Sequence, residues 1–543
     1  MANPQPWWKN AVIYQIYPRS FQDSNGDGIG DLAGIIQRLG YLESLGIDAI
    51  WLSPVYRSPQ DDNGYDISDY CDIDPMFGTL ADMDNLITEA KKHHIRIIMD
   101  LVLNHSSDEH RWFQEAKKSR DNPYHDYYVW RDGVEGTPPN KMRATFGGSA
   151  WTWVPEVGQY YFHQFSIKQP DLNWDNPALR QELYKAIRFW MDKGVGGFRL
   201  DVIDQIAKDP DLGITSNGPM LHAYIRELNA NTFGSTDLVT VGEAWGANVQ
   251  NAPIFSDPRG KEFSMVFQFE HIGLDQIPGK AKWDLAPLQL SALKEVLTKW
   301  QVGLHGKGWN SLFWNNHDLP RIVSRWGNDG AYRQESAKML ATLLHGMQGT
   351  PYIYQGEELG MTNTTFHSLD DCQDLEEINA WHQYVDEQKK VSPETMLACF
   401  NTVARDNART PMQWTAGKNA GFTDATPWLA VNPNYKTINA EAALKDPDST
   451  FYYYQKLIRL RHASPIIVYG TFEPLLEDDP NIYAFARHLG GETLLIACNW
   501  TSEEVPCTLF DGKDGEELIS NYASHKTGTL QPYEARVLLL RNA

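Results

Sequence analysis

Gly196-Gly197-Phe198-Arg199-Leu200-Asp201-Val202 places two opposite charges inside an apolar run that begins with a glycine pair. The run predicts a short buried strand. Side chains two positions apart in a strand point to the same side, so Arg199 and Asp201 share a face. We expect the arginine to hold the aspartate ionised, and an ionised carboxylate at a strand end can attack an electrophilic carbon. A purely structural ion pair is the alternative, which this stretch alone does not exclude.

Strand and helix patterns alternate on both sides of this stretch. Strand-like runs precede it at 13–17, 49–52 and 95–103 and follow it at 238–243, 264–269, 311–314 and 351–354. Helices are predicted at 32–45, 83–94, 177–193 and 451–462. The alternation predicts an α/β fold, a (β/α)8 barrel of the TIM type. Active sites of that barrel lie at the carboxyl ends of its strands, and four polar residues fall there: His105, Asp201, Glu243 and Asp318.

Three segments depart from the alternation. Residues 106–169 are rich in aromatic residues, Gly and Pro and predict an inserted subdomain after the third strand. Beyond about residue 465, strand-like pieces predict a C-terminal antiparallel β-sandwich domain. We therefore expect a catalytic barrel from 1–105 and 170–463, the insertion at 106–169, and the β domain at 464–543. The excursion at 361–449 would be an oversized loop after the eighth strand, and loops of that size are usually functional.

Composition limits the classes of partner. Forty-eight basic and 70 acidic residues among 543 give a net charge of −22, which disfavours nucleic acids and anionic membranes. No apolar run is long enough to span a bilayer, and residues 1–9 lack the pattern of a secretion signal. The five cysteines are scattered and predict reduced thiols: Cys71, Cys372, Cys399, Cys498 and Cys507. We expect a cytoplasmic protein, monomeric or weakly oligomeric.

The segment Asp23–Asp31 is a glycine-rich loop with oxygen-bearing side chains at every second position. Such loops cage hard cations, and we expect a structural Ca²⁺ (or Mg²⁺) here, with no organic cofactor. The expected ligands are Asp23, Asn25, Asp27, the carbonyl of Ile29, and Asp31. The loop is not an EF-hand, because Gly34 stands where that motif needs glutamate. An acidic turn without metal is the alternative.

Two of the strand-end acids have the properties that glycosidic bond cleavage needs. One carboxyl group must be ionised to attack, and the other must carry a proton for the leaving group. Asp201 suits the first role because of Arg199. Glu243 suits the second because Val241 and Trp245 make its setting less polar, which raises a carboxyl pKa.

Five motifs resemble those of the α-amylase family (glycoside hydrolase family 13), in the order in which that family has them. They are Asp100-Leu-Val-Leu-Asn-His105, Gln169-Pro-Asp-Leu-Asn173, Gly197-Phe-Arg-Leu-Asp201, Val241-Gly-Glu-Ala-Trp245 and Asn315-Asn-His-Asp318. The resemblance covers the whole chain. It implies an oligosaccharide substrate and a covalent glucosyl intermediate with retention of configuration. The cation loop resembles the calcium site of the family.

The resemblance also implies a role for individual residues. Asp201 would be the nucleophile, Glu243 the general acid/base and Asp318 the transition-state stabiliser. The residues lining the sugar subsite on the non-reducing side of the cleaved bond (−1) would be His105, Arg199 and His317. That subsite would be closed by Asp62, Tyr65 and Arg405, with Arg409 the alternative arginine, and the +1 subsite would hold Trp245 and Lys282.

Within the family, the chain resembles the group that removes glucose from α-1,6-linked chains, the oligo-1,6-glucosidases and glucan 1,6-α-glucosidases. The run 309–320 and the run 264–271 are of that type. Val202, directly after the nucleophile, is Val in 1,6-acting members and Ala or Thr in 1,4-acting ones. The alternatives are a 1,4-specific α-glucosidase, a sucrose- or trehalose-acting transglucosidase, the catalytically silent transporter subunit of this fold, and a carbohydrate-binding module.

Overall fold

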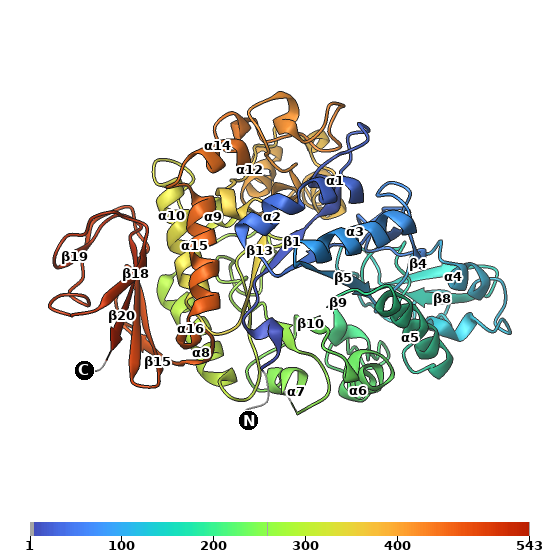
Figure 1. Cartoon of the computed structure of the whole chain (residues 1–543). Coiled ribbons are helices and arrows are strands. Elements are labelled where there is room, and N and C mark those ends of the chain that lie inside the picture. The colour runs from blue at the N-terminus through green and yellow to red at the C-terminus, as the bar shows by residue number, and fades with distance from the viewer. Residues whose placement is uncertain (1–4, 258, 542–543) are drawn as a thin grey trace.

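Eight parallel strands form the centre of the computed structural model, which describes residues 5–257 and 259–541 (Figure 1). Of residues 1–9, for which no secretion signal is predicted, residues 1–4 lie outside that range. The strand order is β11-β10-β9-β5-β2-β1-β13-β12, and a parallel bridge between Val266 and Asn310 joins the two edges. The predicted (β/α)8 barrel is therefore confirmed. Its strands are β1 (Ile13–Ile16), β2 (Ala49–Leu52), β5 (Arg96–Val102), β9 (Gly197–Asp201), β10 (Val239–Glu243), β11 (Met265–Phe267), β12 (Ser311–Phe313) and β13 (Thr350–Tyr354).

Helices surround the barrel and bury one apolar face each against it. Side chains that bond to free backbone N–H groups fix where two of these helices begin. Asn176 caps α5 by accepting the N–H groups of Ala178 and Leu179, and Thr79 and Asp82 form a capping box on α3. The main helices are α1 (Leu32–Gln37), α2 (Leu39–Leu45), α3 (Leu80–Lys92), α5 (Pro177–Asp192), α6 (Leu221–Asn231), α8 (Leu290–Leu304), α10 (Arg333–His345) and α15 (Thr450–Ala463). None of the helices in the described part of the chain is long and apolar enough to cross a membrane.

The prediction of one continuous helix at 32–45 is wrong, because helical geometry is interrupted at Arg38 and separates α1 from α2. Arg38 leaves helical geometry (φ −105°, ψ 3°). Its guanidinium donates to the Gln22 side chain, with Nε at 2.8 Å, and stacks 4.1 Å from the centre of the Trp414 ring. Both partners come from distant parts of the chain, so these tertiary contacts override the local helical pattern.

The segment after β5 is the predicted insertion, and it forms a small separate sheet. The strands β6 (Trp130–Arg131), β8 (Gln159–Phe162) and β7 (Trp151–Val154) pair in that order, beside the short helix α4 (Arg111–Ala116). Two isolated bridges, His105 with Asp171 and Tyr128 with Leu172, attach this sheet to the chain that enters and leaves it. The insertion thereby stands next to the carboxyl end of β5.

The C-terminal part is an antiparallel sheet in the order β14-β15-β16-β20-β18, at the left of Figure 1. Alternate side chains explain its position: Tyr483 and Phe485 join the main core, whereas Ile482 and Ala484 face a second, two-stranded sheet. The strands are β14 (Thr471–Leu475), β15 (Ile482–Leu489), β16 (Glu492–Asn499), β18 (Glu516–Ser520) and β20 (Ala535–Arg541), with β17 (Val505–Pro506) and β19 (Thr529–Leu530) opposite them.

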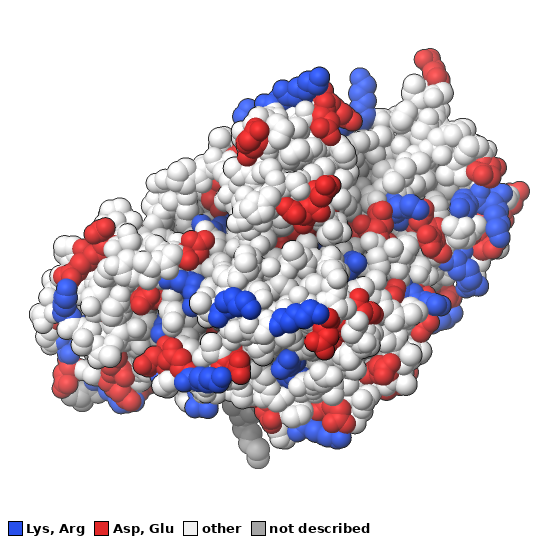
Figure 2. Space-filling model, turned by 90° about the horizontal axis from the view of Figure 1, so that it is seen from above, with Lys and Arg blue, Asp and Glu red and all other residues white. Residues whose placement is uncertain are grey.

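The predicted excursion after β13 is ordered by short helices rather than being one open loop. They are α11 (Leu375–Trp381), α12 (Pro393–Val403), α13 (Asp406–Arg409) and α14 (Ala440–Lys445). Figure 2 shows basic and acidic side chains interspersed over the face seen there. That mixture differs from the continuous basic surface typical of nucleic-acid binding. The expectation that neither nucleic acid nor membrane is a partner stays a prediction.

Candidate active site

A cavity of about 460 Å³ opens where the barrel strands end. Asp201 and Glu243 are the last residues of β9 and β10, and His105 and Asp318 follow β5 and β12 within a few residues. Eleven of the thirteen residues predicted for catalysis or substrate binding line it: Asp62, Tyr65, His105, Asp201, Val202, Glu243, Trp245, Lys282, His317, Asp318 and Arg405. Acids that are hundreds of positions apart in sequence therefore meet in one place.

Arg199 is not among the residues that line the cavity, and its expected place in the −1 subsite stays a prediction. It lies buried beneath the floor and contacts three carboxylates at once. Its Nη1 is 2.8 Å from Asp201 Oδ1 and 2.8 Å from Asp100 Oδ1, and its Nη2 contacts Glu243 Oε2. One guanidinium therefore serves three acids, and it spans the two predicted catalytic carboxyl groups.

The sharing of Arg199 changes the protonation of this group. Burial raises the pKa of Asp201 well above its usual range, and Glu243 and Asp100 add to the rise against the opposing effect of Arg199. Burial also raises the pKa of Asp100 to about 6. The direction of this shift opposes the predicted effect of Arg199 on Asp201, because one positive charge is shared among three buried carboxyl groups. Asp201 and Glu243 are thus neighbours that share one guanidinium, and Glu243 makes ionisation of Asp201 beside it less favourable.

Glu243 is held by three donors. The N–H of Val202 lies 3.0 Å from its Oε2, the indole N–H of Trp245 lies 3.0 Å from its Oε1, and Arg199 makes the third contact. The Val202 contact requires an unusual backbone, with φ 35° and ψ 43° in the left-handed region. A β-branched residue seldom adopts that region, and such strain clusters at functional sites.

A second charged group forms the other wall. Arg405 places Nε 3.1 Å from Asp318 Oδ1 and Nη2 3.4 Å from Asp62 Oδ1. Arg409 places Nη2 3.0 Å from the same Asp318 oxygen, but it is fully buried and does not reach the cavity. Of the two candidate arginines, Arg405 is thus the one that faces the cavity, and its role in closing the −1 subsite stays a prediction. Both arginines also contact Asp374.

Protonation in this second group differs from one acid to the next. Burial works against ionisation of Asp318, but His317, Arg405 and Arg409 outweigh it and hold its pKa well below the usual range. Burial lowers the pKa of His317 to about 3, so this ring is neutral near pH 7 and the arginines supply the lasting charge. Burial raises the pKa of Asp62 to about 7 although Arg405 opposes it.

The aromatic and imidazole rings give the inner cavity a fixed shape. Tyr65 stacks on His317 with ring centres 5.1 Å apart, and its hydroxyl donates to Asp100 Oδ2 at 3.0 Å. His105 contacts the Tyr65 carbonyl through Nε2 at 3.1 Å, and burial lowers the pKa of His105 to about 4. Both histidines are therefore neutral hydrogen-bonding groups near pH 7.

The outer cavity is bounded by Trp245 and Lys282. Trp245 is half exposed and stacks on Phe269 with centres 4.0 Å apart. Lys282 is 2.5 Å from Glu376 Oε2, and both residues line the cavity. Several lining residues belong to none of the five motifs, so their position in the sequence did not indicate a role: Phe146, Phe165, Gln205, Gln276 and Glu376.

The Asp23–Asp31 loop is a series of turns closed by its own side chains. Asp23 Oδ1 accepts the N–H groups of Asn25 and Gly26, and Asp31 accepts the Gly34 N–H as the cap of α1. Its all-oxygen donor set is of the type that hard cations prefer. Among the described residues, however, Asp23, Asp27 and Asp31 do not come together within 4.8 Å of one another. The calcium site stays a prediction.

Comparisons with known proteins agree with this geometry. The family model described as alpha amylase, catalytic domain, matches residues 15–470, and a beta-galactosidase C-terminal domain model matches residues 486–540. The chain is 53% identical to the oligo-1,6-glucosidase of Parageobacillus thermoglucosidasius, covering 98% of this chain and 99% of that one. It is 54% identical to the glucan 1,6-alpha-glucosidase of Streptococcus pneumoniae, covering 98% of each.

Solved structures give the same result. The trehalose-6-phosphate hydrolase of Bacillus licheniformis superposes with a TM-score of 0.94 at 46% identity, over 99% of this chain and 100% of that one. The trehalulose synthase of Pseudomonas mesoacidophila superposes with a TM-score of 0.95 at 44% identity, over 99% and 100%. The chain belongs to the α-amylase family. Within that family it is a glycoside hydrolase, with full-length relatives named for action on α-1,6-linked glucose.

Proposed function

We propose that this protein is an exo-acting, retaining α-glucosidase that releases glucose from the non-reducing end of α-1,6-linked oligosaccharides. One observation carries the proposal: a single guanidinium, that of Arg199, contacts both Asp201 and Glu243. Carboxyl groups of retaining glycosidases lie about 5–5.5 Å apart, whereas inverting enzymes leave room for a water between them. The close approach of these two acids supports the retaining class.

In the first half of the reaction, Asp201 attacks the anomeric carbon while Glu243 gives its proton to the departing glycosidic oxygen. The C–O bond to the leaving sugar breaks and an ester to Asp201 forms. Asp201 and Asp318 both line the cavity, so negative charge faces the sugar carbon that becomes positive. Asp318, held ionised, would grip sugar hydroxyl groups in that transition state.

In the second half, Glu243 accepts a proton from water, and the water oxygen displaces Asp201 from the sugar. Two inversions restore the starting configuration, so the product is α-glucose. Trp245 donates its indole N–H to Glu243 in the arrangement described above, which keeps the carboxyl group aimed at the leaving oxygen. No step in this scheme involves the predicted cation.

The closed inner end of the cavity supports exo action. Asp62 and Arg405 meet there at 3.4 Å, and the Gln169 side chain donates to Asp62 Oδ2 at 3.0 Å. A chain continuing past the inner sugar would have to displace these buried groups. The early products from a long isomaltooligosaccharide should therefore be glucose and the chain shortened by one unit, and a ladder of mid-sized products would contradict the closed pocket.

The names of the relatives and the resemblance at Val202 support the α-1,6 linkage. The decisive experiment compares kcat/KM on isomaltose, maltose, sucrose and trehalose 6-phosphate, with products separated by chromatography. We expect isomaltose to be preferred and glucose to be the product. Preference for maltose, conversion of sucrose to an isomer, or preference for the phosphorylated disaccharide would each replace the 1,6 assignment with the corresponding alternative.

A further inference from the structure

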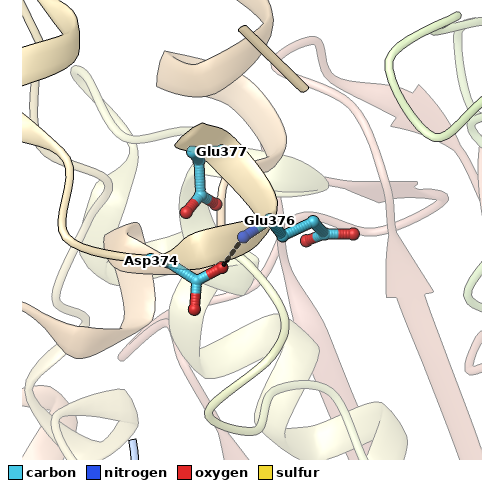
Figure 3. Close-up of side chains that lie close together, drawn as sticks. All are labelled: Asp374, Glu376 and Glu377. Carbon is cyan, nitrogen blue, oxygen red and sulfur yellow. Dashed lines mark hydrogen bonds between the residues drawn. The ribbon is translucent and has the colours of Figure 1, made fainter. Parts of the chain in front are cut away.

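The start of α11 carries three acids, Asp374, Glu376 and Glu377, that the proposed mechanism does not use (Figure 3). Asp374 caps the helix by accepting the Glu376 N–H at 2.8 Å, the dashed line in Figure 3. Basic side chains already pair with two of these acids, since Lys282 binds Glu376 and two arginines bind Asp374. These acids therefore have partners within the protein.

Asp374 is the point at which the two arginines of the inner subsite meet. Its Oδ2 contacts Nη1 of Arg409 and lies 3.3 Å from Nη2 of Arg405. The same two arginines converge on Oδ1 of Asp318 from their other nitrogens, at 3.0 and 3.1 Å. Asp374 is fully buried and does not line the cavity, so it acts only through other residues.

Glu377 fixes the backbone beside the same contact. Its Oε1 accepts the N–H of Arg405 at 2.7 Å. Burial, reinforced by Asp374 and Asp406, raises the pKa of Glu377 well above its usual range. Burial opposes ionisation of Asp374 too, but Arg405 and Arg409 prevail and lower its pKa to about 2. Of these two buried acids, Asp374 is therefore the one whose ionised form is favoured, and it is the one that contacts both guanidinium groups.

We propose that Asp374 is a positioning residue that fixes Arg405 and Arg409 and, through them, the carboxylates of Asp62 and Asp318. This inference rests on the proposed function, because it names what holds that site in its reactive geometry. An arginine has many rotamers, and a catalytic group must be held within a fraction of an ångström. Two residues further on, Glu376 holds Lys282, so the first turn of α11 supports the inner and the outer parts of the cavity together.

The test replaces Asp374 with Asn, which keeps the shape and the helix cap but removes the charge. We expect kcat/KM for 4-nitrophenyl α-glucoside to fall about 100-fold, the usual cost of a misplacement near 1 Å. Binding of 1-deoxynojirimycin, an imino sugar shaped like glucose, should weaken as well. Asp84→Asn is the matched control. Asp84 lies on α3 and forms an ion pair with Lys193 outside the cavity, so the same change there should leave kcat/KM and inhibitor binding unchanged.

A double variant separates positioning from general destabilisation. If Asp374 acts through Arg405, then Arg405→Gln combined with Asp374→Asn should lose little more activity than the more damaging single change. Independent, multiplying losses would overturn the proposal. So would an Asp374→Asn enzyme that is folded by circular dichroism and retains activity within about threefold, a margin well short of the expected loss.

A second variant and the choice of substrate allow the Asp374 experiment to be interpreted in every case. Should Asp374→Asn not fold, Asp374→Glu retains the charge but shifts it by one methylene, and we expect a folded enzyme with an intermediate loss; full activity would contradict positioning. The aryl glucoside lacks a second sugar, so these outcomes do not depend on linkage. A wild type inactive on isomaltose would overturn the proposed function, while inhibitor binding would still report on Asp374.

Discussion

Replacing Val202 with Ala tests the determinant of linkage with little disturbance elsewhere. Val202 is 5% exposed, lines the cavity and directly follows Asp201. Its backbone N–H donates to Glu243, and alanine can make the same bond because the contact involves only the main chain. The substitution therefore changes the shape of the cavity at the predicted +1 subsite, while Glu243, the proposed general acid/base, keeps its backbone partner.

The expected stability change is small because two effects oppose each other. Removing two methyl groups from a buried site costs about 0.8 kcal/mol each, or roughly 1.6 kcal/mol in total. Alanine keeps the Cβ atom that makes left-handed backbone costly, so only the added crowding of the branched side chain is relieved, which offsets part of that loss. We therefore expect the melting temperature to shift by only a few degrees. A control, Val239→Ala, makes the same deletion in a buried strand residue outside the cavity and lacks the compensating relief.

The effect on specificity should be larger. An α-1,6 link adds a methylene between the leaving oxygen and the acceptor ring, so a branched side chain at this position crowds one acceptor placement more than another. A contact of this kind is worth about 1–3 kcal/mol, or about 10- to 200-fold in relative kcat/KM. We expect Val202→Ala to raise maltose hydrolysis relative to isomaltose by at least about tenfold, while Val239→Ala leaves the ratio unchanged.

Steady-state assays on isomaltose, maltose and 4-nitrophenyl α-glucoside measure this ratio, with the aryl substrate reporting whether the catalytic groups remain intact. An unchanged ratio in an enzyme that still cleaves the aryl glucoside would refute the reasoning, because the acceptor would then not sense Val202.

Three other predictions concern the chemistry and the cation. Asp201→Asn and Glu243→Gln should each abolish turnover without lowering the melting temperature, and the first wild-type product seen by NMR should be α-glucose; β-glucose would contradict the retaining assignment. Because burial raises the pKa of Asp201, its ionised fraction falls as the pH drops through that raised value, so kcat/KM should decline at a pH above about 4; an acid limb below pH 4 would count against this. A chelator should lower the melting temperature if the loop of Asp23 and Asp31 holds Ca²⁺, since loss of a ligand bound only by the folded state destabilises it; unchanged melting would leave that loop an acidic turn.

The barrel could be predicted because its strands are buried on both faces. Such strands appear in sequence as short apolar runs, and all eight were located within a few residues of their observed ends. The gathering of the three candidate acids at one end of the barrel followed from the same pattern, since parallel strands point their carboxyl ends to one side. Asp201, Glu243 and Asp318 therefore needed only their position relative to a strand.

What only the tertiary structure decided depends on contacts between distant segments. The break at Arg38 requires Gln22 and Trp414, and the choice of Arg405 over Arg409 depends on which guanidinium reaches the cavity. The protonation of Asp201 also depends on contacts between distant segments. A neighbour two positions away suggested that Asp201 is ionised, but a pKa responds to all nearby charges and to burial.

The sequence by itself determined the fold class, the strand ends and the residue types available there, because these follow from local hydrophobic pattern and chain direction. The way in which buried charges share partners was decided only by folding. Arg199 serves three acids and Asp374 serves two arginines, and those relations join residues from separate strands and loops. Electrostatic energy depends on distance and dielectric in three dimensions, neither of which a linear order of residues specifies.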